Sequence, residues 1–172
     1  MRLSRNFFSR DVLKVAPQLL GKVLVRRFAD GREMRLTINE TEAYRGEEDL
    51  GCHASKGRTR RTEVMYHHGG LVYVYLIYGM YWLLNFTTGQ EGHPQAVLIR
   101  GSYEIKGPGR IGRALQLDKS FYGEDLITSD RLWLEKPGGR NETPVFIAFP
   151  RVGIDYAGEV WAGKLWRFKT DR

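Results

Sequence analysis

The spacing of hydrophobic and polar residues predicts a short helix near the start of the chain and a hairpin after it. Residues 7–20 carry apolar side chains at helical spacing, Ser9 or Asp11 can cap the start, and Gly21 can stop the helix. Two extended stretches come next, separated by turn residues at 29–31. These predicted hairpin strands cover residues 23–25 and 34–39.

A period-two pattern continues through residues 37–44, where small or polar side chains alternate with others. Such a pattern predicts a strand with two chemically different faces. The residues expected to share one face are Ile38, Glu40, Glu42 and Tyr44. Two acids and an aromatic ring would then point in the same direction.

A second hairpin is predicted at residues 71–86, where two runs rich in β-branched, leucine and aromatic residues flank Gly79-Met80. A two-residue loop with glycine first places Tyr78 at the tip. Further along, we expect a strand at 96–100, a turn entering a helix at 107–117, and a late strand pair or loop at 145–154. Together these elements predict an α+β fold, a single domain over 1–172 with a curved, mainly antiparallel sheet and surrounding helices.

The net charge of the chain indicates a class of binding partner. The chain has 27 Lys and Arg against 20 Asp and Glu, a formal net charge of +7 that favours a polyanion such as nucleic acid. Cys52 is the single cysteine, which excludes an internal disulfide framework, and the start lacks the apolar region of a secretory signal. The longest apolar run is too short to span a bilayer of about 30 Å. We expect a cytoplasmic monomer, nucleoid-associated in a bacterium, without a membrane partner.

One predicted strand offers candidate acids for catalysis. Glu42 lies beside Tyr44 instead of in a charged surface run, and a carboxylate there could accept a proton from water and stabilise an oxocarbenium-like state. An exposed glutamate paired with an arginine would have the same pattern. Glu40, Glu48 and Asp49 are rivals that spacing alone does not exclude. If Glu40 and Glu42 were buried together, repulsion would raise one pKa and give an acid and base pair.

Aromatic residues gather around the second predicted hairpin, where rings could stack on a base or wedge into a base step. They are Tyr73, Tyr75, Tyr78, Tyr81 and Trp82. Most are expected in the core, whereas Tyr78 at the turn cannot easily be buried by its own strand.

Two basic segments could contact phosphates. In the loop-like stretch 45–62, the cations cluster around Gly57 and are Lys56, Arg58, Arg60 and Arg61. Residues 106–110 form neither a Walker loop nor a dinucleotide fingerprint, but glycines before a helix leave N–H groups free for an anion beside Lys106 and Arg110. An ordinary tight turn is the alternative.

Side chains that could ligate zinc are Cys52, His53, His67, His68 and His93. No CxxC or HxxxH spacing fixes two of them on one element. Solvated or backbone-bonded histidines are the expected outcome, and no metal is predicted.

Several ordered segments resemble one known family over nearly the whole chain. They are LLGKVLVRR (19–27), ETEAYRGEED (40–49) with His53, YVYLIYGMYWLLN (73–85), AVLIR (96–100), GPGRIGRAL (107–115) and RVGIDYAGE (151–159). The sequence thereby resembles the alkyladenine DNA glycosylases, also called 3-methyladenine or methylpurine DNA glycosylases. The resemblance implies an enzyme that flips an alkylated or deaminated purine from double-stranded DNA and hydrolyses its N-glycosidic bond. It further implies no metal or organic cofactor, water instead of a lysine nucleophile, and an abasic product.

The same resemblance implies residue roles in the reaction. Glu42 would be the general base, Arg100 and the backbone of Val152 would help it to hold the water, and Glu40 would be structural. Tyr78 would enter the minor groove and fill the gap left by the extruded nucleotide.

Other implied roles concern the flipped base. The purine would stack between Tyr44 and His53 on one side and Tyr75 on the other, with the His53 backbone reading the base edge. Asn85 would discourage the 2-amino group of guanine sterically. The two basic segments supply the candidate contacts to the DNA backbone, which are Arg58, Arg60, Arg61, Lys106, Gly109 and Arg110.

The chain departs from the usual family pattern in a few places. Thr62 stands where Asn is common, Tyr66 replaces a common Phe, RGSYE at 100–104 differs from Arg-Ala-x-x-Pro, and Trp82 is larger than many residues there. These changes bear on the lesion range more than on the reaction. The sequence does not rank 3-methyladenine, 7-methylguanine, hypoxanthine and ethenoadenine as substrates.

Two other functions remain open. A non-catalytic module could recognise bent or damaged DNA with the same basic face and hairpin, and turnover separates it from a glycosylase. A hydrolase of free nucleosides could use Glu40 and Glu42 as a carboxyl pair, but it leaves the basic loop and the Tyr78 hairpin without a purpose. Competition by undamaged DNA discriminates this last alternative.

Overall fold

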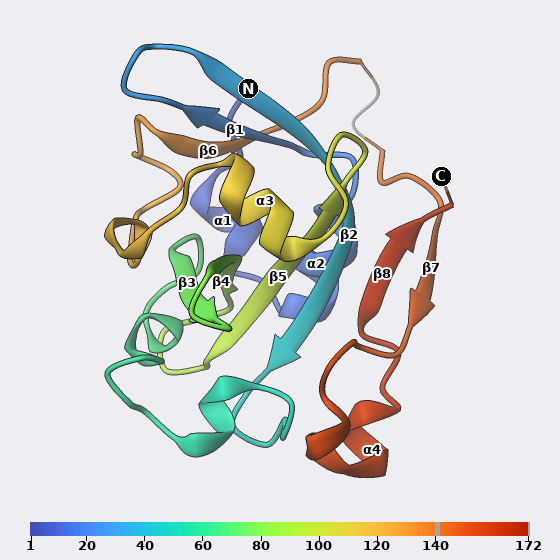
Figure 1. Cartoon of the computed structure of the whole chain (residues 1–172). Coiled ribbons are helices and arrows are strands. Elements are labelled where there is room, and N and C mark those ends of the chain that lie inside the picture. Colours follow the sequence, from blue (N-terminus) through green and yellow to red (C-terminus); the bar gives the residue numbers. More distant parts are fainter. Residues whose placement is uncertain (140–141, 172) are drawn as a thin grey trace.

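A curved antiparallel sheet organises the molecule (Figure 1). The computed structural model describes residues 1–139 and 142–171. The strands are β1 (Val23–Arg27), β2 (Glu33–Arg45), β3 (Val72–Ile77), β4 (Tyr81–Thr88), β5 (Gln95–Ser102), β6 (Leu132–Glu135), β7 (Phe146–Phe149) and β8 (Arg167–Thr170). The helices are α1 (Arg5–Phe8), α2 (Val12–Gln18), α3 (Pro108–Ala114) and α4 (Gly158–Ala162), with 3₁₀ turns η1 (His53–Lys56), η2 (Glu63–Tyr66), η3 (Lys119–Phe121) and η4 (Asp155–Ala157).

The strand order explains the shape in Figure 1. Hydrogen-bonded neighbours run β3-β4-β5-β2-β1-β6, while β8 also pairs with β2 and β7 with β8. Every one of these pairings is antiparallel. The predicted α+β class with a curved, mainly antiparallel sheet is therefore confirmed. No helix among the described residues has the length and apolar character needed to cross a bilayer.

The first predicted helix is in fact two helices. Asp11 takes an extended backbone conformation and its carboxylate accepts the Leu13 N–H at 2.9 Å, so it caps α2 and interrupts the predicted helix at 7–20. Ser9 instead ends α1 as its C-cap. After α2, Gly21 has a φ of 80°, as expected for a glycine that follows a helix.

The first predicted hairpin is confirmed, but its second strand is longer than expected. β2 is one strand of 13 residues that pairs with β1 at its start and with β5 and β8 at its end. The register between β2 and β5 shifts on both sides of Glu40, which interrupts the alternation of faces. Ile38 consequently lies in the main core with Ala43. The prediction that Ile38 shares a face with Glu42 is wrong because of this irregularity.

The second predicted hairpin is confirmed as β3 and β4, with a small correction at its tip. The residues with left-handed backbone are Tyr78 (φ 51°) and Gly79 (φ 65°), one position earlier than the predicted Gly79-Met80 loop. The Met80 N–H closes the turn on the Ile77 carbonyl at 3.0 Å. Tyr78 is 86% exposed. It also has a positive φ, which few non-glycine residues adopt.

The later elements agree only in part with the sequence pattern. β5 and α3 occur where a strand and a helix were predicted. The segment 145–154 holds one strand, β7, which pairs with β8 instead of with a neighbour inside the segment. The short strands β6 and β8 were not predicted.

Two apolar clusters hold the sheet and the site in place. The larger one packs α2 and α3 against the sheet, and the Thr41 hydroxyl joins α2 to β2 through the Ala16 carbonyl at 2.9 Å. A smaller cluster, drawn largely from residues 52–73, includes Cys52, Met65 and Tyr73, and Tyr44 and Tyr75 pack against it. The second cluster fixes the loop after β2 beside the aromatic hairpin.

Candidate active site

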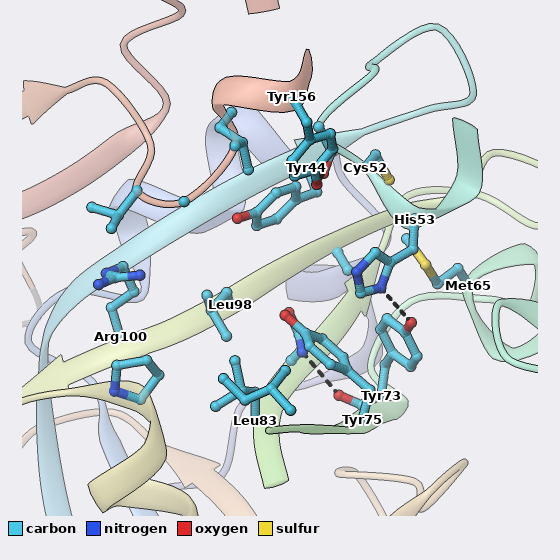
Figure 2. Close-up of a pocket in the computed structure, with 18 of the residues that line it drawn as sticks. Tyr44, Cys52, His53, Met65, Tyr73, Tyr75, Leu83, Leu98, Arg100 and Tyr156 are labelled. Carbon is cyan, nitrogen blue, oxygen red and sulfur yellow. Dashed lines mark hydrogen bonds between the residues drawn. The ribbon is translucent and has the colours of Figure 1, made fainter. Parts of the chain in front are cut away.

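A pocket of about 430 Å³ opens beside the end of β2 (Figure 2). Its walls come from β2, η1, the β3–β4 hairpin, β5 and the segment 152–156. The sequence-predicted site residues that line it are Tyr44, His53, Tyr75, Tyr78, Asn85, Arg100 and Val152. The fold therefore brings together residues that lie on separate segments of the chain.

Glu42 lies behind this pocket with no exposed side-chain surface. Its Oε1 accepts the Val152 N–H at 2.8 Å, its Oε2 accepts the Tyr44 hydroxyl at 2.7 Å, and Arg100 Nη1 is 3.4 Å from Oε1. Burial raises the pKa of Glu42, while the Arg100 charge and then the Val152 and Tyr44 hydrogen bonds lower it, and burial prevails. The result is a carboxylate with raised basicity whose three partners all line the pocket.

Glu40 occupies a different electrostatic setting from Glu42. Its Oε1 is 3.0 Å from Arg167 Nη1 and 3.5 Å from Arg100 Nε, and its Oε2 is 3.9 Å from Lys169 Nζ. No hydrogen bond joins Glu40 to Glu42 within the described part of the chain; Arg100 lies between the two carboxylates. This arrangement does not support Glu40 as the partner in an acid and base pair.

The rival acid Asp49 is committed to a buried ion pair that the sequence did not reveal. Both Asp49 oxygens accept from Arg151, at 2.6 and 2.8 Å, and neither side chain is exposed. Arg151 Nη1 also donates to the Ala43 carbonyl at 2.9 Å, and its guanidinium lies 4.9 Å from the Tyr44 ring centroid. One hint of this ion pair was present in the sequence, namely that Arg151 directly precedes Val152. We therefore assign Asp49 a structural role and not a catalytic one.

His53 is held as a neutral imidazole at one side of the pocket. Its Nδ1 is 2.7 Å from the Tyr73 hydroxyl, and burial, together with the nearby Arg61 charge, lowers the pKa of His53 to about 4. Its ring lies edge-on to Tyr75, with 4.6 Å between the ring centroids. A flat base sandwiched between two rings needs roughly 7 Å. As they stand, His53 and Tyr75 leave no slot between them.

Figure 2 shows Tyr44 and Tyr75 on opposite sides of the pocket, with His53 at one end. Asn85 lines the same space, and its Nδ2 donates to the Tyr73 carbonyl at 3.2 Å. This hydrogen bond fixes the orientation of the amide in the pocket lining. Tyr156, which the sequence analysis did not single out, also lines the opening and is 70% exposed.

The candidate DNA-contacting cations are exposed, but they differ in their partners. Arg58 makes two hydrogen bonds to Glu63, at 2.6 and 2.8 Å, and Arg61 lies 5.0 Å from the Tyr75 ring centroid. The other exposed cations of this group are Arg60, Lys106 and Arg110. A Cβ at Gly109 would lie 2.9 Å from the Tyr81 ring, so this glycine permits close packing of α3 on β4. Arg58 and Gly109 thus have structural explanations of their own.

Two departures from the family pattern form hydrogen bonds next to the basic loop. The buried Thr62 hydroxyl donates to the Gly57 carbonyl at 3.0 Å and accepts the Thr59 N–H at 2.9 Å. The Tyr66 hydroxyl donates to Glu47 at 2.6 Å, a bond that phenylalanine could not form. Both residues stabilise the loop that carries His53.

The potential zinc ligands have other surroundings and partners in the fold. Cys52 is buried, and burial raises the pKa of its thiol to about 12. His67 approaches Glu63 at 3.2 Å, and His68 Nδ1 is 3.0 Å from Arg5. Residues 1–139 and 142–171 contain no group of three or more His, Cys, Asp or Glu arranged to hold a metal ion.

Comparison with known proteins shows the family to which this chain belongs. The profile of the methylpurine-DNA glycosylase family matches residues 6–105 and 102–172. A relative from Natranaerobius thermophilus, provisionally named a 3-methyladenine DNA glycosylase, is 41% identical over 98% of this chain and 94% of the relative. Relatives with the same name from Legionella pneumophila (strain Corby) and Sodalis glossinidius are 43% and 45% identical, over 97% and 98% of this chain and 93% and 96% of theirs. The chain therefore belongs to the methylpurine-DNA glycosylase family.

Proposed function

We propose that this chain flips alkylated or deaminated purines out of double-stranded DNA and hydrolyses their N-glycosidic bond, leaving an abasic site. Its substrates would belong to the class of 3-methyladenine, 7-methylguanine, hypoxanthine and ethenoadenine. Family membership supports the DNA glycosylase activity itself. The observation that carries the mechanism is Glu42, fully buried, with a raised pKa, beside a pocket of about 430 Å³ with aromatic walls.

In the proposed reaction, Glu42 is the general base. A water oxygen attacks C1′, the bond between C1′ and the purine nitrogen breaks, the electron pair leaves with the base, and Glu42 accepts the water proton. Arg100 and the backbone of Val152, which already contact the carboxylate, would help to hold this water. Selectivity would come from easier flipping of damaged pairs and from better leaving groups.

The aromatic walls provide the proposed base-binding surface. Tyr44 and Tyr75 lie on opposite sides of the pocket in Figure 2, so a flipped purine could stack between them. Because the His53 and Tyr75 rings touch, we propose that His53 contributes at the base edge or turns aside when the base enters. Asn85, fixed by its bond to Tyr73, would oppose the guanine 2-amino group.

We further propose that the chain works as one monomeric domain whose DNA contacts surround this pocket. Tyr78 is the wedge that would enter the minor groove, because it lies at the exposed hairpin tip and also lines the pocket. Arg60, Lys106 and Arg110 would contact DNA phosphates. A strong salt dependence of binding follows from such contacts.

Single-turnover excision from duplexes that carry hypoxanthine or ethenoadenine tests the proposal, with wild type and Glu42→Gln compared at low salt. We expect Glu42→Gln to bind the duplex but to lose excision by about 10²–10⁴-fold, the usual contribution of a general base. Glu91→Gln, in an exposed turn, is the matched control and should excise like wild type.

Other outcomes would reassign the function. Equal excision by Glu42→Gln would remove Glu42 from its role. Tight binding by the wild type without excision of these lesions or of alkylated bases would favour the non-catalytic recognition module. Hydrolysis of free nucleosides that undamaged DNA does not inhibit would favour the nucleoside hydrolase.

A further inference from the structure

Glu42 stands at the boundary between two chemically different parts of one sheet face. On one side along β2, Tyr44 lies opposite Ala96 of β5, and Glu42 itself lies opposite Leu98. Ala96, Leu98 and Tyr44 all line the pocket. This side of Glu42 is apolar and aromatic, as a purine requires.

The other side of Glu42 is cationic. In the register between β2 and β8, Arg167 lies opposite Glu42 and Lys169 lies opposite Glu40. Residues directly opposite each other in an antiparallel pair project from the same face of the sheet. Arg100 of β5 completes a group of three cations that we call the cationic cluster: Arg100, Arg167 and Lys169.

The charges of the cationic cluster are not balanced by its own acid. Glu40 is the carboxylate that contacts all three cations, so three positive charges meet one negative charge, and one positive charge still remains if the ionised Glu42 is included. Arg100 Nε is buried and makes no hydrogen bond, although Glu40 Oε1 lies 3.5 Å away. Lys169 keeps 44% of its side chain exposed. A buried donor without a hydrogen bond, a charge surplus and a partly exposed lysine are the features of an anion site.

We infer that the cationic cluster binds a backbone phosphate next to the flipped nucleotide. This inference rests on the proposed function, because it takes C1′ to lie at Glu42. A nucleotide runs from base through sugar to phosphate, so a base in the aromatic part of the face directs its phosphates away from Tyr44. The cationic cluster lies in that direction along β2.

The same inference gives Glu40 a purpose. Three cations packed together without an anion would repel one another, and Glu40 holds them in place while no DNA is bound. A phosphate must then share these cations with Glu40. Removing the Glu40 charge should strengthen binding of the phosphate, whereas removing the Lys169 charge should weaken it.

The test measures binding of wild-type protein and variants to a lesion duplex whose target nucleotide carries a 2′-fluoro group, which slows glycosidic hydrolysis. We expect Lys169→Gln to weaken binding by about tenfold and to lower the slope of log Kd against log salt by about one. Glu40→Gln should bind more tightly than wild type. Lys14→Gln is the matched control, because the exposed Lys14 lies on α2, which packs against the opposite face of β2.

A neutral methylphosphonate then identifies the source of the phosphate. Placed directly 5′ or 3′ of the lesion, it should weaken wild-type binding by about the factor seen for Lys169→Gln, and it should add little to that variant. Placed several nucleotides away, it should affect both proteins equally.

The opposite results overturn the inference. These are a full additional loss when the methylphosphonate is combined with Lys169→Gln, or weaker binding by Glu40→Gln. Excision by the wild type, measured in parallel, separates the two proposals. Normal excision without the expected coupling removes only the phosphate site, whereas coupling without any excision removes only the catalytic proposal.

Discussion

Two carboxylates, Glu42 and Asp49, are fully buried near the same pocket, and their surroundings differ sharply. Asp49 has a complete set of partners: two hydrogen bonds from Arg151, at 2.6 and 2.8 Å, and the N–H groups of Arg45 and Gly51, each at 3.0 Å. Its charge is matched by a guanidinium in direct contact. Such a pair supports the structure around it and leaves no oxygen for chemistry.

Glu42 is compensated much less well. It has one N–H, one hydroxyl and a guanidinium that stays 3.4 Å away and also contacts Glu40. Burial therefore prevails and raises the pKa of Glu42. The comparison teaches that burial alone does not distinguish a catalytic acid from a structural one. The balance between burial and compensation does.

The largest expected effect separates the two carboxylates by stability. Asp49→Asn should lower the free energy of unfolding by about 3–5 kcal/mol, because it leaves the Arg151 guanidinium buried without its counter-ion. Glu42→Gln should leave the free energy of unfolding unchanged, since the raised pKa of Glu42 means that its ionisation opposes folding. The protonated Glu42 contributes stability that is fully present below the unfolded-state pKa. This contribution is lost as pH rises through the folded-state pKa.

Urea unfolding of both variants at neutral pH checks this prediction. Glu33→Gln, an exposed glutamate at the start of β2, controls for the loss of a carboxylate and should change stability by less than about 1 kcal/mol. Equal losses in Glu42→Gln and Asp49→Asn would show that both carboxylates are structural.

The sequence predicted the strand that carries Glu42 and the hairpin tip that carries Tyr78, because alternation and turn residues are local signals. It placed Ile38 on the wrong face, since the irregularity around Glu40 depends on pairing with β5, a strand distant in sequence. The same limit applies to Asp49 and Arg151, which lie 102 residues apart. No local pattern links two such residues.

Short strands that pair far from their own segment were also missed. β8 has four residues and pairs with β2 and β7, so the cationic partners of Glu40 on β8 were not predicted. The roles of Arg100 and Val152 came from the family resemblance instead of from spacing. The structure places both beside Glu42, but their roles in catalysis remain predictions.

The next expected effect concerns Arg100, the nearest cation to Glu42. The Arg100 charge is the largest influence that lowers the pKa of Glu42, so Arg100→Gln should raise this pKa further. A general base must be ionised, and the acid limb of the excision rate should therefore move to higher pH. At neutral pH we expect a loss on the order of tenfold, the size of one charge-assisted hydrogen bond.

Single-turnover rates between pH 5 and 9 measure this shift. Arg32→Gln is the matched control, because Arg32 is exposed between β1 and β2 and is not among the groups that perturb Glu42. A uniform loss of rate at every pH, without movement of the acid limb, would mean that Arg100 acts only in binding or packing.

The smallest expected effect is that of Tyr44→Phe, which removes one hydrogen bond from Glu42 and keeps the aromatic wall. The Tyr44 hydroxyl lowers the pKa of Glu42 less than Arg100 does, so its loss should move the acid limb upward by less than Arg100→Gln. Below the limb we expect about fivefold slower excision, as for a neutral hydrogen bond of about 1 kcal/mol, and above it nearly the wild-type rate. Tyr66→Phe, which removes the hydroxyl bonded to Glu47, should leave the limb in place. If Tyr44→Phe instead lowered the rate equally at all pH values, the hydroxyl would serve base positioning, and the weak compensation of Glu42 would not be what tunes the reaction.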